Sequence, residues 1–157
     1  MSELRSASER SLGRARGAQL LRYVLERGSD EFTITVMALQ DTPAPFADAF
    51  EDELGVFERD AAPREIVSED MELGEVRSVR LWSFDEKSLA RLLTFLDEGL
   101  FHSPAGPDGW LENLAVYRAG ELVLGIISHH REGVLRLEPA EHARLAELGI
   151  SSTSRPS

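Results

Sequence analysis

The chain has 157 residues, no cysteine and a net charge of −11 at neutral pH. Without cysteine it has no disulfide framework, no thiolate nucleophile and no cysteine-ligated zinc or iron–sulfur site. No apolar run reaches the ~20 residues of a membrane span, and the polar N-terminus does not read as a secretory signal, so we expect a cytoplasmic protein outside the membrane.

The first elements in chain order are a polar tail, a helix and a strand. Residues 1–14 are rich in arginine and serine and predict a disordered, basic N-terminal tail. Apolar residues at helical spacing predict a helix over residues 15–27. Aromatic and β-branched residues with a period of two then predict a strand over residues 31–39, central in a sheet because both of its faces are apolar or carry threonine.

An acidic helix is predicted next, over residues 44–57, with a proline at its first position. Its apolar stripe consists of Phe46, Phe50, Leu54 and Phe57. This stripe indicates a side that packs in the core; the alternative is an exposed ridge that anchors a partner. Residues 59–75 are a polar, acidic connection in which Ile66 and Val67 could form a short edge strand.

A second strand–helix pair follows this connection. Alternating apolar residues predict a strand over residues 76–84. Ser83 and Glu86 match the S-x-x-E capping box immediately before a leucine stripe, which predicts a helix over residues 85–98. Residues 101–110 are dense in proline and glycine and predict a loop.

Three short strands are predicted after the loop, over residues 111–118, 121–128 and 134–137. The two-residue turns Ala119-Gly120 and Glu132-Gly133 connect them, and such short connections require antiparallel neighbours. The three strands therefore form a meander. Pro139 opens a last helix over residues 139–148.

Together these elements predict an α+β fold: a mainly antiparallel sheet of about five strands, a C-terminal three-stranded meander, and helices packed mostly on one face. We expect one domain over residues 15–150, between the tail at residues 1–14 and a second disordered tail at residues 151–157.

Motifs with a known chemical mechanism are absent from the sequence, including phosphate-binding loops, the H-E-x-x-H zinc motif and the G-x-S-x-G nucleophile turn. We therefore predict no cofactor, no metal site and no catalytic residue. The alternative is a small enzyme or ligand-binding protein with a pocket beside the 101–110 loop, in which His102, His129 and His130 supply acid–base chemistry. Ser128 beside His129 is weak evidence for a nucleophile, because a catalytic pair needs contact in space.

The charge is unevenly distributed along the chain. Residues 1–22 carry +3, whereas residues 41–75 carry twelve acids and two arginines. Such a negative body repels nucleic acid and attracts a basic partner. The residues predicted to bind it are the acids Glu51, Asp52, Glu53, Glu58 and Asp60, with Trp110 as an exposed aromatic anchor.

These observations favour a non-enzymatic module that binds a basic or amphipathic protein, of the inhibitor, immunity or chaperone type. The arginine-rich usage, with Lys87 as the single lysine, suggests a GC-rich bacterial gene. Two alternatives remain open: an acidic surface that only keeps the protein in solution, and a self-associating structural subunit. The sequence does not predict the oligomeric state.

Overall fold

The computed structural model describes residues 2–39, 42–60, 75–96, 99–100 and 108–154. Its strands are β1 (Glu3–Ser8), β2 (Glu31–Ala38), β3 (Glu75–Ser83), β4 (Trp110–Arg118), β5 (Glu121–Ile127), β6 (Glu132–Leu137) and β7 (Thr153–Ser154). Its α-helices are α1 (Arg14–Glu26), α2 (Pro45–Leu54), α3 (Glu86–Phe95) and α4 (Pro139–Glu147). The α+β class is confirmed, but the described residues form seven strands in place of about five.

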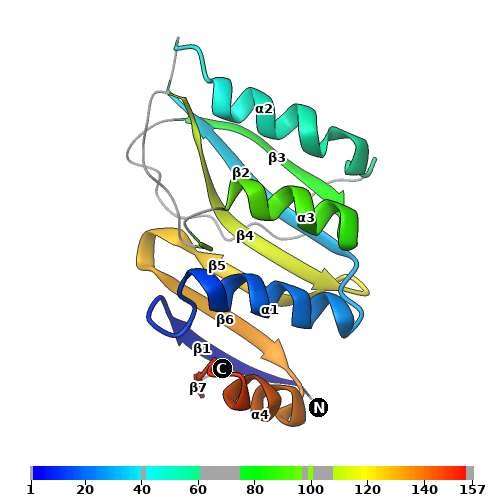
Figure 1. Cartoon of the computed structure of the whole chain (residues 1–157), viewed down its shortest axis with the longest axis vertical. Helices are drawn as coiled ribbons and strands as arrows, with labels where there is room; N and C mark the ends of the chain where they lie inside the picture. The colour runs from blue at the N-terminus through cyan, green and yellow to red at the C-terminus, as the bar shows by residue number, and fades with distance from the viewer. Residues whose placement is uncertain (1, 40–41, 61–74, 97–98, 101–107, 155–157) are drawn as a thin grey trace.

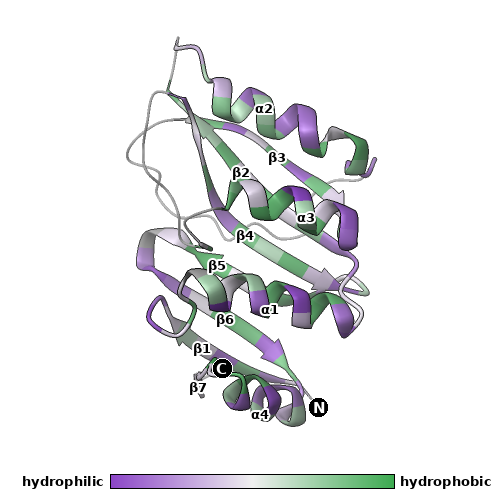
Figure 2. Ribbon diagram, viewed as in Figure 1, coloured by the Kyte–Doolittle hydropathy of each residue, from purple (hydrophilic) through white to green (hydrophobic). Residues whose placement is uncertain are grey.

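The strands form one open antiparallel sheet in the order β3-β2-β4-β5-β6-β1-β7. Helices α1, α2 and α3 lie next to one another across the same face of this sheet, and α4 lies near β1 (Figure 1). The strands below the helices carry long apolar stretches, above all β2 and β5 (Figure 2). β2 is central, with β3 on one side and β4 on the other, as its pattern predicted.

The core lies between the helices and the sheet. Phe32 of β2 stacks on Trp82 of β3 with ring centroids 5.4 Å apart, and Phe50 of α2 meets the same indole edge-on at 5.6 Å. Phe50 and Leu54 are buried, while the other two members of the α2 stripe pack against the core at its margin. The stripe is therefore core, and the alternative of an exposed anchor ridge is wrong.

The first residue of α3 differs from the sequence prediction. The N-cap is Asp85, whose carboxylate accepts a hydrogen bond from the Ser88 N–H at 2.8 Å, while the Ser88 hydroxyl accepts one from the Asp85 N–H at 2.9 Å. Ser83 belongs to β3, since pairing with Glu31 extends the strand to that residue. The expected box at Ser83 and Glu86 is wrong because strand pairing takes precedence over local capping.

The meander β4-β5-β6 is confirmed. Ala119 and Gly120 both have positive φ, 49° and 82°, as the two central residues of a type I′ hairpin turn require. The second connection is not the predicted Glu132-Gly133 turn but a short 3₁₀ turn, η2 (Ser128–His130). Gly133 lies inside β6, where a Cβ would approach Leu12 Cδ1 to 2.8 Å, so this glycine permits close packing and makes no turn.

The tails expected at residues 1–14 and 151–157 are wrong where the structure describes them. Residues 3–8 form β1, which pairs along its whole length with β6, and residues 153–154 form β7 on its other edge. The Arg5 guanidinium connects β1 to the residues before β7 by donating to the Ser152 carbonyl at 2.7 Å. The polar composition of β1 concealed it, because only Ala7 in it is buried.

Candidate functional site

The acids of α2 and of the residues just after the 3₁₀ turn η1 (Gly55–Phe57) divide into two sets by direction. Because an α-helix advances 100° per residue, successive residues cannot share one direction. Glu51 points to the sheet and its side chain is only 14% exposed. Asp52 and Glu53, the next two residues, are exposed to solvent. The sequence analysis assigned all three acids to one binding surface, but the helix directs Glu51 to the sheet and the other two to solvent.

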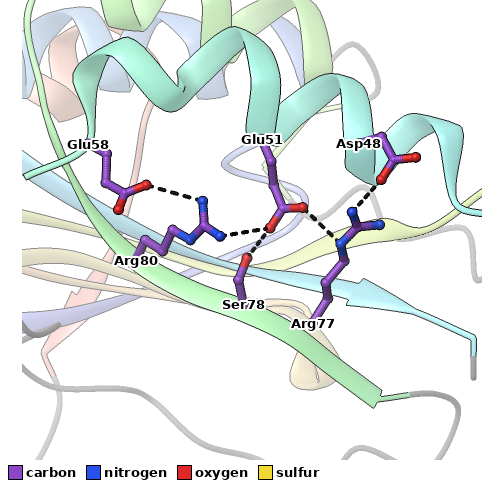
Figure 3. A network of polar contacts seen from close by, with 6 residues as sticks. All are labelled: Asp48, Glu51, Glu58, Arg77, Ser78 and Arg80. Atoms are coloured by element: carbon purple, nitrogen blue, oxygen red, sulfur yellow. Dashed lines mark hydrogen bonds and ion pairs between the residues drawn. The ribbon is translucent and has the colours of Figure 1, made fainter.

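The set that faces the sheet is held by residues of β3 (Figure 3). Glu51 accepts a hydrogen bond from the Ser78 hydroxyl at 2.7 Å and lies 2.8 Å from Arg77 Nε and 3.7 Å from Arg80 Nη2. Arg77 also pairs with Asp48, and Arg80 donates to Glu58 at 3.1 Å. We call these six residues, Asp48, Glu51, Glu58, Arg77, Ser78 and Arg80, the α2–β3 network.

A β-bulge explains how two neighbouring residues of β3 reach the same helix. Val36 pairs with Ser78 and Met37 with Val76, so Arg77 is the extra residue in β3. Side chains of a regular strand alternate between faces, but a bulge breaks that alternation. The hydrogen bond with Asp48 is the main cause that raises the pKa of Arg77 above its usual value. The network is therefore a charged clamp between α2 and the edge strand β3.

The outward set is different, because its carboxylates are largely unclamped. Within the described ranges, neither Asp52 nor Asp60 has an ion pair, and Glu53 pairs only with the exposed Arg91 of α3. Val56, in η1 between these acids, is 82% exposed, more than any other large apolar side chain that the structure describes. We call Asp52, Glu53, Val56 and Asp60 the η1 surface.

The backbone adds to the negative potential at this end of the sheet. The Glu58–Trp82 bridge and the hydrogen bond from the Arg59 N–H to the Leu81 carbonyl fix η1 beside the last residues of β3. α2 therefore ends here, and its last turn contains acids and no basic residue. Carboxylates near the negative end of a helix dipole are unfavourable by about 0.3–1 kcal/mol each. Pairing with arginines offsets this cost for Glu51 and Glu53, whereas Asp52 has no ion pair among the described residues.

Trp110 does not belong to the η1 surface. It is 3% exposed in β4, and its indole N–H donates to the Glu112 carboxylate at 3.2 Å. The prediction of an exposed aromatic anchor is wrong because the residue lies inside the sheet, opposite Met37 of β2, and not in the preceding loop.

Of the three histidines proposed for the alternative pocket, the structure describes the side chain of His130 alone, so this pocket stays a prediction. His102 lies outside the described residues, and for His129 only the backbone, in η2, is described. His130 is exposed and lines a shallow hollow of about 390 Å³. We call it the polar hollow; its other walls are Ser6, Ser8, Ser11, Arg131, Glu132, Ser151, Ser152 and Thr153.

Ser128 has a structural role. Its hydroxyl accepts a hydrogen bond from the Asn113 N–H at 2.9 Å, and its own N–H donates to the Asn113 side chain at 3.1 Å. Asn113 has a φ of 55° in β4, so this reciprocal pair holds a distorted strand. The described residues contain no cluster of histidine and carboxylate side chains that could hold a metal ion.

Sequence reasoning missed Val56 and the arginines of β3. Val56 was missed because the sequence analysis considered only the apolar stripe of this helix, and Val56 lies outside that stripe. The signal for the clamp was present as Arg77 and Arg80 on an expected strand next to an acidic helix, but which acids they reach depends on the bulge.

No protein-family model matches this sequence, and no curated protein or solved structure matches it significantly. In the described part of the chain, the helices are too short or too polar to cross a membrane. The physical features of the surface are therefore the basis for a functional proposal.

Proposed function

We propose that this protein is a non-enzymatic interaction module that binds a basic or amphipathic protein through the η1 surface. One observation carries the proposal: Val56 is 82% exposed and stands among the exposed acids Asp52, Glu53 and Asp60. An exposed apolar side chain flanked along the chain by exposed carboxylates is suited to a partner that presents an apolar residue next to lysine or arginine. A module of this kind fits an inhibitor, an immunity-type protein or a chaperone.

The two components of this surface have separate effects on binding. Burial of a valine side chain contributes roughly 1.5 kcal/mol to affinity and slows dissociation. The carboxylates accelerate association and make it sensitive to salt. Glu51 and Glu58 belong to the α2–β3 network. Substituting them would alter the packing of α2 on β3 as well as the surface charge, so they are poor choices for a binding test.

The test uses a fluorescein-labelled peptide in which leucine and lysine repeat at helical spacing, with binding followed by stopped-flow anisotropy. Asp52→Lys together with Asp60→Lys is expected to lower the association rate about tenfold at low salt. Val56→Ser is expected to leave that rate unchanged and to increase the dissociation rate.

The matched control is Glu121→Lys together with Glu147→Lys, a double reversal of exposed carboxylates in β5 and α4 that lie outside the η1 surface. It keeps the wild-type association rate if the η1 surface is the binding site. Equal association rates for the wild type and the double reversal would contradict the proposal.

The polar hollow supports a second candidate function, the binding of a small polar ligand. Its hydroxyl groups together with His130 and Arg131 can donate to a carboxylate or phosphate group, while the Glu132 carboxylate in the same lining already accepts from the Ser6 hydroxyl. A thermal-shift screen with inorganic phosphate and small dicarboxylates tests it: a stabilisation that disappears in His130→Ala supports this function, and no shift with any compound removes it.

A further inference from the structure

The helical layer contains an apolar groove that the η1 surface does not include. Leu25 of α1 and Leu89, Ala90 and Leu93 of α3 line a groove of about 370 Å³ between the two helices, which lie side by side on one face of the sheet (Figure 1). Leu89 is buried and forms the floor, whereas Leu25 and Leu93 are only partly buried and Ala90 is exposed. Its size is at the lower end of the ~300–1,000 Å³ range of ligand pockets.

Charged side chains of both helices form the rim of this groove, with the acidic ones at one end. Glu26 of α1 and Glu86 of α3 both line it, together with Arg22 one helical turn before Glu26. Glu31 at the start of β2 pairs with Ser83 at the end of β3. The end of α1, which precedes β2, and the start of α3, which follows β3, therefore lie at the same ends of these two strands. The two carboxylates therefore stand at the same end of the groove and the guanidinium lies nearer its middle.

This acidic end of the groove and the η1 surface lie on the same side of the molecule, where β2 begins and β3 ends. The Glu58–Trp82 bridge places η1 beside the end of β3, and the Phe84 N–H donates to the Asp30 carbonyl at 2.8 Å, which places the start of α3 beside the end of α1. A single partner segment that lies across this side of the molecule can thus contact the carboxylates of the groove and those of the η1 surface.

We propose that the α1–α3 groove is the seat of an apolar side chain on a basic segment of the partner protein, with Glu26 and Glu86 receiving the lysine or arginine beside it. This inference rests on the proposed function and extends the binding surface from η1 to the groove. Three leucines provide contact area, and two carboxylates at one end fix the direction of the segment.

The experiment compares two probes, the leucine–lysine peptide and an oligolysine of equal length. Ala90→Arg fills the groove from an exposed position on α3, and Ala143→Arg makes the same change on the exposed side of α4 as the control. The leucine–lysine peptide is expected to bind Ala90→Arg about tenfold more weakly than wild type, while oligolysine, which loses only part of its attraction to Glu86, is expected to weaken by less than about threefold. Methyl NMR of the wild type is expected to show peptide-dependent shifts at Leu25 and Leu93.

Four outcomes overturn the inference. Peptide-dependent shifts at Val56 with none at Leu25 or Leu93, or equal affinities for Ala90→Arg and wild type, refute the groove and leave the proposed function intact. Absence of binding by both probes refutes the proposed function as well. Sedimentation that shows a dimer of the free protein, dissociated by Ala90→Arg, assigns the groove to a second copy of the chain and refutes the partner segment.

Discussion

Adjacent residues of α2 have different roles although their chemistry is the same. Glu51 is enclosed by Arg77, Ser78 and Arg80, whereas Asp52 faces water with no ion pair within the described ranges. Their difference arises from the strand below the helix. A sequence pattern gives the direction of a side chain relative to its own helix, but the position of β3 beneath α2 depends on the fold, so the sequence could not separate them.

This difference predicts unequal effects on stability. Glu51→Gln removes the charge that two arginines share and is expected to lower the free energy of unfolding by about 1–3 kcal/mol. Asp52→Asn is expected to stay within about 0.5 kcal/mol of wild type. Urea denaturation of the two variants checks this prediction, and equal midpoints would contradict the clamp.

A second buried carboxylate, Glu141 of α4, is 3% exposed and joins three segments. It accepts hydrogen bonds at 3.1 Å from Arg27, Arg118 and the Glu138 N–H. Burial raises the pKa of Glu141, but the hydrogen bonds from the Glu138 N–H and the two guanidinium groups outweigh it, so the pKa lies below its usual value of 4.5. The anionic form is thus the one that stabilises the fold.

A depressed pKa fixes the sign of the pH dependence. The contribution of Glu141 is fully present above pH 4.5 and is lost as the pH falls through the lower pKa of the folded state. Glu141→Gln is therefore expected to be less stable than wild type at neutral pH, with a difference that shrinks in acid. Thermal unfolding of both proteins from neutral to acidic pH measures it; a difference independent of pH would contradict the prediction.

At the scale of elements, local pattern predicted those whose residues carry a strong period. The helices α1 to α4, the central strand β2 and the meander β4-β5-β6 were all anticipated, since apolar spacing or turn residues identify them locally. The strands β1 and β7 were not anticipated, because polar residues fill them and their pairing with distant partners defines them.

The role of β1 predicts that an N-terminal substitution destabilises the whole fold. Ala7 is buried beside β6, so Ala7→Asp places an unpaired charge in the interior and is expected to cost about 3 kcal/mol or more. Ser8→Asn, at the exposed neighbour, is expected to be nearly neutral because it adds no charge opposite Glu132. Urea denaturation compares them, and equal stability would mean that residues 3–8 are not part of the sheet in solution.

The N-cap of α3 offers a second test at this scale. Asp85→Ala removes the carboxylate that accepts from Ser88 and is expected to cost about 1 kcal/mol. Ser83→Ala is expected to have little effect, since Ser83 ends β3 and does not cap the helix. Thermal unfolding of both variants distinguishes the two positions; a larger loss in Ser83→Ala would support the cap that the sequence suggested.

For the whole molecule, the sequence predicted an excess of negative charge but not its arrangement. Part of that charge is paired within the fold, since Asp48, Glu51 and Glu58 form ion pairs with arginines of β3. Asp52 and Asp60 are exposed to solvent. The candidate site was thus predicted in its chemistry and general location, whereas its apolar centre Val56 and the clamp beneath it required the three-dimensional arrangement.

A net charge of −11 predicts that salt stabilises the fold. Screening weakens the repulsion among exposed carboxylates, so the midpoint of urea unfolding is expected to rise between low and moderate ionic strength. Asp52→Lys is expected to be more stable than wild type at low salt by a few tenths of a kcal/mol and to respond less to salt. A salt response equal to that of wild type would show that the charge at Asp52 is not part of the repulsive set.

The pairing of β1 with β6 has a consequence for how the protein forms during synthesis. Glu3 lies opposite Leu137, so β1, which precedes the other described strands in the chain, cannot pair with β6 until residues 132–137 have also emerged from the ribosome. The β2–β3 ribbon can assemble earlier, while β1 stays solvated, and its polar side chains protect it from aggregation during that wait. We therefore expect the pairing of β1 with β6 to form late, because it joins residues far apart in the chain.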